Sequence, residues 1–75
     1  MDLDLDSGDP LYLQLAALLR EQIKSGKLTG RVPSARSLAE EHEVSHRTSE
    51  RALAILRDEG LIRAVVGKGH YTVRQ

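Results

Sequence analysis

No cysteine occurs among the 75 residues. This absence excludes a disulfide framework, a thiolate metal site and a cysteine nucleophile, and it favours a reducing, cytoplasmic setting. The sequence also has no run of 18 apolar residues, so a membrane-spanning helix is not expected. Its acidic beginning does not match the basic start of a secretory signal peptide. We therefore expect a soluble, cytoplasmic protein without a membrane partner.

The small size argues against catalysis. A chain of this length forms one domain and buries only about 60% of the surface of its unfolded chain. With 40% hydrophobic residues, it can fill one small core but hardly also wall a substrate cleft. The sequence contains no obvious carboxylate pair, no nucleophile set beside a base and no phosphate-cradling loop. It thus predicts a protein that is not an enzyme and uses no cofactor.

The charged residues balance in number, with 11 Lys and Arg against 11 Asp and Glu, but they are unevenly placed. Residues 1–10 contain four aspartates and no basic residue, so residues 11–75 hold 11 basic residues against 7 acidic ones, a net charge of +4. We expect residues 1–9 to be an acidic, flexible lead-in and residues 10–75 to form the domain. A neutral total therefore does not exclude a nucleic-acid partner.

The first helix signal follows Asp9-Pro10, a capping carboxylate and a proline whose fixed φ suits the first helical position. The helix is expected to stop at Ser25-Gly26. At 100° per residue, the side chains that gather on one face are Leu11, Tyr12, Leu15, Leu18, Leu19 and Ile23, and those that point away are Leu13, Arg20 and Lys24. The basic link that follows could make a brief strand contact at Arg31-Val32.

Two short helices follow, joined by three residues. The first comprises residues 35–42 and is capped by Ser34, and the second runs from a cap at Ser45 to Gly60. On the same angular count, the buried face of the second helix consists of Ser49, Ala52, Leu53 and Leu56, and its outer face shows Arg47, Glu50, Arg51, Ala54 and Asp58. Such a pair, the second helix with a polar, partly basic outer face, is typical of a helix-turn-helix.

The spacing of the apolar residues changes from a helical to a strand-like pattern after Gly60. Residues 61–66 are apolar and rich in β-branched side chains, residues 67–69 tolerate a turn, and residues 70–74 alternate. This pattern predicts a β-hairpin with Lys68 at its tip. A hairpin directly after a helix-turn-helix is a wing. The predicted fold class is mainly α with a small β-hairpin, a winged helix-turn-helix of three helices followed by a two-stranded wing.

The predicted third helix carries groups suited to double-stranded DNA. An α-helix fits the major groove, and in the helix-turn-helix mode its N-terminal turn contacts base edges. Arg47 lies mid-face on that turn, where its guanidinium can offer two donors to guanine. Ser45 and Thr48 suit phosphate oxygens. Arg36 is placed for phosphate or a groove edge, and Lys68 for phosphate or the minor groove.

Several of these residues also have a simpler role open to them. Ser34 and Ser45 are helix caps first and DNA contacts only in addition, and Arg36 could simply be solvated. Arg51 either pairs with an acidic neighbour, Glu50 or Asp58, or contacts phosphate.

The three histidines do not predict a metal site. His42 and His46 stand four residues apart, but the expected turn lies between them and no third ligand is obvious. His70 is expected in the wing as a strand residue that faces solvent or phosphate, because no nucleophile or acid is set beside it. We expect no bound metal.

Together these segments resemble the N-terminal DNA-binding domain of the GntR (gluconate-repressor) family of bacterial transcription factors, from Pro10 to Val73. The motifs that carry the resemblance are PLYLQLA (10–16), GKL (26–28), VPSARSLA (32–39), VS (44–45), RALAILRDEGLI (51–62) and GKGHYTV (67–73). The resemblance implies a winged helix that binds a roughly palindromic operator as a homodimer, usually as a repressor. The DNA contacts that it implies are Arg36, His46, Arg47, Thr48, Gly67, Lys68 and Gly69.

The sequence departs from the family pattern at four positions. Ala35 stands where the family usually has the glutamate of PSER, Glu43 where a glycine commonly turns, and His46 where an arginine usually follows VS. Glu50 occupies a position often held by a DNA-contacting arginine. It could accept a hydrogen bond from a cytosine amine or hold the neighbouring arginines in place. We therefore expect a base preference different from that of the family.

Family members normally carry a C-terminal domain that binds a small-molecule effector and dimerises, and no such domain follows within the 75 residues. The chain is expected to be either a DNA-binding domain cut from a longer regulator or a very short member, and an effector matters only if the full protein has that domain.

The alternative function is a winged-helix protein-interaction module without DNA binding, which would need an apolar outer face on the third helix. The candidate DNA-binding residues are Ser34, Arg36, Ser45, His46, Arg47, Thr48, Glu50, Arg51, Gly67, Lys68 and Gly69.

Overall fold

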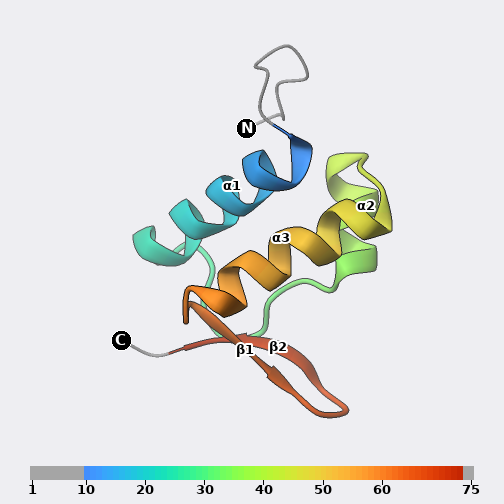
Figure 1. The fold of residues 1–75 in the computed structure, drawn as a ribbon. Helices are drawn as coiled ribbons and strands as arrows, with labels where there is room; N and C mark the ends of the chain where they lie inside the picture. Colours follow the sequence, from blue (N-terminus) through green and yellow to red (C-terminus); the bar gives the residue numbers. More distant parts are fainter. Residues whose placement is uncertain (1–9, 74–75) are drawn as a thin grey trace.

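The computed structural model describes residues 10–73 and contains three helices followed by a two-stranded antiparallel hairpin (Figure 1). The elements are α1 (Leu11–Ser25), α2 (Ala35–His42), α3 (His46–Asp58), β1 (Ile62–Val65) and β2 (Gly69–Thr72). In Figure 1, α3 lies between α1 and the hairpin, with α2 beside its N-terminal end. The predicted fold class is confirmed. The predicted acidic lead-in, residues 1–9, lies outside the described residues.

The helices begin and end at residues that suit capping positions. Pro10 itself occupies the N-cap position of α1, one residue later than predicted, while Asp9 lies outside the described part of the chain. Gly26 closes α1 in the left-handed conformation, with φ of 84°. Ser34 and Ser45 cap α2 and α3 as predicted, because each side chain accepts a hydrogen bond from the backbone N–H three residues on.

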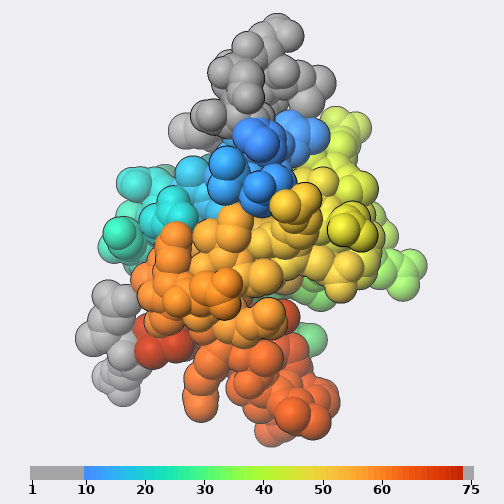
Figure 2. All heavy atoms as spheres, in the orientation of Figure 1, coloured from blue at the N-terminus to red at the C-terminus, as the bar shows by residue number. Residues whose placement is uncertain are grey.

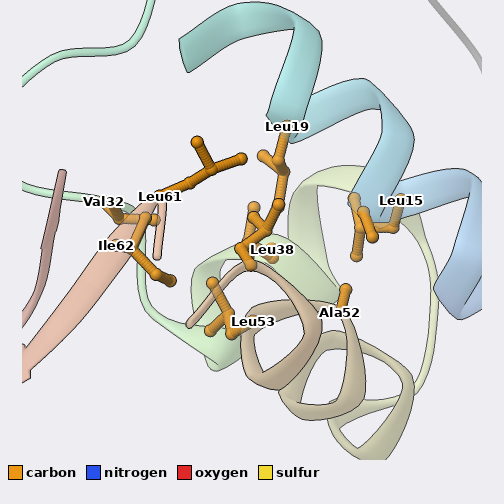
Figure 3. Packing of buried hydrophobic residues seen from close by; sticks show 10 residues of the cluster. Leu15, Leu19, Val32, Leu38, Ala52, Leu53, Leu61 and Ile62 are labelled. Carbon is orange, nitrogen blue, oxygen red and sulfur yellow. The ribbon is translucent and has the colours of Figure 1, made fainter. Parts of the chain in front are cut away.

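The hydrophobic core lies where α1, α2 and the hairpin meet α3. Figure 3 shows Leu15 and Leu19 of α1 close to Leu38 of α2 and to Ala52 and Leu53 of α3. The buried residues of α3 are Ser49, Ala52, Leu53 and Leu56, the predicted set. Burial of these apolar side chains supplies the main free energy of folding, about 25 cal/mol for each Å² removed from water. This burial also fixes the rotation of α3 about its own axis, and so determines which side chains of α3 are exposed to solvent.

The wing is attached to the helical part at both of its strands. The side chain of Ile62 at the start of β1 is buried in the core. On the other side of the hairpin, β2 pairs with the link between α1 and α2, where Arg31 forms an isolated bridge to Tyr71 and Val32 N–H donates to the His70 carbonyl at 2.9 Å. The brief strand contact predicted at Arg31-Val32 is thus confirmed, and it fixes the wing relative to α2.

None of the helices within residues 10–73 is long and apolar enough to cross a membrane.

Arg20 does not simply point away from the molecule, as the helical periodicity predicts. Its Nε and Nη2 donate to the two carboxylate oxygens of Glu59 at 2.8 and 2.6 Å, which joins α1 to the residue that ends α3. These hydrogen bonds hold the pKa of the Glu59 carboxyl below its ordinary value of about 4.5. Both side chains remain partly exposed, so the pair is worth at most about 1 kcal/mol.

The Arg20–Glu59 pair should make stability depend on pH in acid. Because the folded state lowers the pKa of Glu59, the stabilisation is present above the unfolded pKa and is lost as the pH falls through the folded pKa. Glu59→Gln should therefore lower the free energy of unfolding at pH 7. Below pH 4 the free energies of unfolding of the variant and of wild type should come closer together, because Glu59 becomes protonated in wild type. Urea titrations at several pH values measure this. Glu40→Gln is the matched control, because Glu40 is exposed and lies 3.4 Å from Arg36. If both variants behave alike, the pair with Arg20 contributes nothing specific.

The turn between α2 and α3 holds Glu43 in a conformation that suits glycine. Glu43 has φ of 55° and ψ of 43°, and it is the only non-glycine residue with positive φ among residues 10–73. An L-residue in this region costs about 1–2 kcal/mol. The backbone of Glu43 still closes the helix, because its N–H donates to the Ala39 carbonyl. The turn therefore forms without the expected glycine, at a cost in strain.

Glu43→Gly should stabilise the domain by about 0.5–1 kcal/mol, because relief of the left-handed strain exceeds the extra entropy of glycine in the unfolded chain. Urea unfolding at pH 7 measures the change. Glu43→Ala removes the same charge but keeps a Cβ, so it should give no comparable gain. An equal gain in both variants would assign the effect to charge, and no gain in either would show that the turn is unstrained.

Candidate nucleic-acid interface

The N-terminal turn of α3 is organised by its cap. The Ser45 hydroxyl accepts from the Thr48 N–H at 3.0 Å and donates to the Thr48 hydroxyl at 2.9 Å. Ser45 is therefore a cap, and its pairing with Thr48 holds both hydroxyls at the entrance of the helix. The N–H groups of the first turn point out of a helix end, where they attract anions. This end of α3 suits phosphate or a polar base edge.

Arg47 is the exposed basic residue of that first turn. Within residues 10–73 no carboxylate forms an ion pair with it. No carboxylate of the described residues thus competes for its guanidinium donors, and their bidentate geometry suits the N7 and O6 acceptors of guanine. The structure leaves Arg47 where the sequence places it, on the outer face of α3.

Arg36 has an acidic neighbour, Glu40, that was not predicted from the sequence. Its Nε lies 3.4 Å from Glu40, one turn further along α2, and the two side chains are 85% and 72% exposed. An ion pair this exposed is weak, so Arg36 can exchange Glu40 for a phosphate. The other residue predicted on this helix, Ser34, caps α2 by accepting from the Ser37 N–H at 3.1 Å.

Glu50 does not hold the neighbouring arginines. Its Oε1 lies 3.6 Å from Nε2 of His46, one turn earlier on α3, and both side chains are about 60% exposed. Two residues that depart from the family pattern are thus paired with each other at the centre of the candidate interface. The negative charge of Glu50 on this face disfavours phosphate and favours a donor such as the cytosine amine.

Of the two alternatives left open for Arg51, the structure does not show the ion pair, because neither Glu50 nor Asp58 pairs with it. Its Cζ lies 4.0 Å from the centroid of the Tyr12 ring on α1. This contact is a cation–π interaction between helices, and helical spacing alone cannot reveal it because it depends on how α1 crosses α3.

A hollow of about 360 Å³ lies where α2, α3 and the wing meet. Of the predicted site residues, the structure brings Ser34, Glu50 and Gly69 together around this hollow. Its wall also contains Arg31 and Arg57, two basic residues that the sequence analysis did not select. Arg57 lies seven residues after Glu50 and therefore on the same stripe of α3. This helical spacing could have identified Arg57 as a neighbour of the candidate interface.

The tip of the wing is a tight turn that exposes Lys68. Gly67 has φ of 77° and Gly69 has φ of 105°, and the Lys68 N–H donates to the Val65 carbonyl at 3.0 Å. The Lys68 side chain is exposed and has no ion pair with the residues that the structure describes. Figure 2 shows the surface of α3 at the centre of this face, with the wing projecting below it. Lys68 is at the tip, as predicted.

The histidines differ in their surroundings. His70 lines the hollow, and its Nε2 is buried without a hydrogen-bond partner among the described residues. The expectation that His70 faces solvent or phosphate is therefore wrong for this atom. No group of three or more His, Cys, Asp or Glu side chains in residues 10–73 could hold a metal ion.

These features define the class of the protein. Three helices, a capped helix-turn-helix with an exposed polar third helix, and a hairpin with a basic tip together make a winged helix-turn-helix domain of the DNA-binding type.

The chain belongs to the gntR family of bacterial regulatory proteins, whose model matches residues 11–72. It therefore matches the DNA-binding domain of GntR-family transcriptional regulators, and this domain is not an enzyme. The resemblance noted in the sequence is confirmed. The chain spans only 13% to 30% of the length of the curated relatives that it matches.

Three similar proteins illustrate the relationship. The HTH-type transcriptional repressor NagR of Bacillus subtilis is 36% identical over 73 residues, which cover 95% of this chain and 30% of NagR. The solved structure of YtrA from Sulfolobus acidocaldarius, a GntR-family transcription factor, is 33% identical with a TM-score of 0.89, and the match covers 99% of this chain and 80% of YtrA. The structure of AraR(DBD) in complex with operator ORE1 is 26% identical with a TM-score of 0.82, over 97% of this chain and 94% of that one.

Proposed function

We propose that this chain binds double-stranded DNA in a sequence-specific manner and acts in a transcriptional repressor. The proposal rests on the outer face of α3, where Arg47 is exposed and has no acidic partner among residues 10–73, and where the wing and the start of α2 flank the same helix. Two of the similar proteins support it, since NagR is a repressor and AraR(DBD) was solved in complex with an operator.

In this proposal α3 enters the major groove with its N-terminal turn. Arg47 reads a guanine, and Glu50, whose Oε1 lies 3.6 Å from His46 Nε2, accepts from a cytosine amine. Ser45 and Thr48 present the helix end to a phosphate. The further phosphate or minor-groove contacts are Ser34, Arg36, Arg51, Gly67, Lys68 and Gly69.

We further propose that two copies bind the two halves of a palindromic operator, in the cytoplasm. A two-fold operator with half-sites about one helical turn apart would match a symmetric dimer. The relatives are longer than this chain, so dimerisation and any response to an effector are proposals about the whole protein.

Selection of bound duplexes from a random pool by the 75-residue chain tests this function. We expect one short motif containing G·C pairs, and a repeat of that motif would give the half-site spacing. Affinity for the selected duplex should fall steeply with salt, because each neutralised phosphate releases counterions. Failure to bind or enrich any duplex at low salt would reject the proposal and favour the protein-interaction module.

A further inference from the structure

The contact between Arg51 and Tyr12 joins the candidate interface to a helix outside it. Arg51 Cζ lies 4.0 Å from the centroid of the Tyr12 ring. Tyr12 is half-buried in the first turn of α1, and that helix is anchored by the buried residues Leu15, Ala16 and Leu19. The ring is therefore a fixed platform, whereas the arginine above it is exposed.

Stacking leaves the guanidinium able to bind an anion. Arg51 Cζ lies over the Tyr12 ring, and when a guanidinium stacks on a ring through its flat face, its N–H donors lie in the plane and point outward from the edge. Face and edge therefore act independently, and a phosphate can take two donors while the ring keeps the face. Within residues 10–73 no carboxylate pairs with Arg51, although Glu50 and Asp58 lie on the same helix.

The position of Arg51 complements that of the wing. Arg51 lies one turn after Arg47 on the same stripe of α3, and it leans toward α1. Glu50, the preceding residue, lines the hollow beside the wing instead. A helix in the major groove has a phosphate backbone on each side. Lys68 of the wing would serve one side, and Arg51 is placed to serve the other.

We propose that Tyr12 is a positioning residue for DNA binding: it holds the Arg51 guanidinium against α1, ready for a phosphate beside the groove occupied by α3. The inference rests on the proposed DNA binding and assigns α1 a part in it without a DNA contact of its own. An arginine that is already stacked loses less conformational freedom on binding than one that moves freely in solvent.

The test is a double-mutant cycle on affinity for the selected duplex, measured over a range of salt concentrations. Arg51→Ala should weaken binding roughly tenfold and reduce the salt slope by about 0.9, the value for one phosphate. Tyr12→Leu should weaken binding about 2- to 5-fold, the range of an exposed cation–π contact. Its salt slope should stay at the wild-type value because the arginine charge is still present.

Two comparisons separate positioning from a merely structural role. Tyr12→Phe keeps the ring and should bind like wild type, and in the Arg51→Ala background Tyr12→Leu should cause no further loss. An equal loss in both backgrounds, an unchanged salt slope in Arg51→Ala or a loss in Tyr12→Phe as large as in Tyr12→Leu would each overturn the inference. Urea unfolding of each variant identifies losses that come from reduced folding.

The outcome for the wild-type chain distinguishes the two proposals. A wild-type chain that binds no duplex overturns the proposed function and this inference with it. A wild-type chain that binds its selected duplex, while Tyr12→Leu binds equally well, overturns the inference alone.

Discussion

Arg47→Ala should remove most of the preference for the selected duplex over a shuffled one, a loss of about 1–3 kcal/mol in discrimination, or roughly 5- to 150-fold. The reason is geometric. Arg47 is exposed on the first turn of α3, the part of a recognition helix that contacts base edges, and no carboxylate among residues 10–73 competes for its donors. In the proposed binding mode, truncation would remove two hydrogen bonds to guanine while leaving the buried face of α3 intact.

Fluorescence anisotropy with both duplexes at one salt concentration measures the effect. Lys68→Ala is the matched control, because it also removes one exposed positive charge but from the tip of the wing. It should weaken binding to both duplexes by the same factor and leave the preference unchanged. If Arg47→Ala also weakened both duplexes equally, Arg47 would be a phosphate contact and the base reading would lie elsewhere on α3.

Ser49→Ala should raise the free energy of unfolding by about 1–3 kcal/mol. Ser49 is fully buried in α3, and its hydroxyl has no hydrogen-bond partner in the described part of the chain. A buried polar group without a partner costs about this much. Alanine removes the hydroxyl, leaves almost no cavity and has the higher helix propensity.

Urea or thermal unfolding gives the change in stability. Ala52→Ser supplies the matched control, since Ala52 is equally buried three residues further along α3. It introduces a hydroxyl into the same core and should cost a similar amount. Should Ser49→Ala prove neutral or destabilising, the Ser49 hydroxyl must have a partner in solution, such as the backbone carbonyl one turn earlier.

Local signals in the sequence were enough to predict the helices, the wing and most of the exposed side chains of α3. The buried face of α3, including Ser49, follows from the helical repeat, and the starts of α2 and α3 follow from Ser34 and Ser45. These features depend on residues close in sequence.

The contacts between elements could not be predicted in the same way. Arg20 reaches Glu59 and Arg51 stacks on Tyr12 because α1 crosses α3 at one particular height and angle. The hollow that joins Glu50 to Arg57 and His70 depends on how the wing docks against α3. The crossing of α1 over α3 and the docking of the wing both depend on side-chain packing throughout the core. The apolar pattern of a single helix does not specify this packing.

The departures from the family pattern lie mainly at the interface and the turn before it. His46 and Glu50 form a pair on the outer face of α3, and Glu43 takes up the turn conformation in place of glycine. The core is made of ordinary aliphatic residues. The chain thus keeps the scaffold of the family while it presents a different charge pattern to DNA, so its preferred bases should include a cytosine opposite Glu50.

We propose that the face formed by α3 and the wing reads a DNA sequence. The most direct test of this proposal is the ratio of dissociation constants of the unmodified chain for the selected duplex and for a shuffled duplex of equal length and composition, at about 0.15 M salt, where the attraction between exposed charges is screened. We predict that the selected duplex binds about a hundredfold more tightly or better. Equal dissociation constants for the two duplexes would contradict the account.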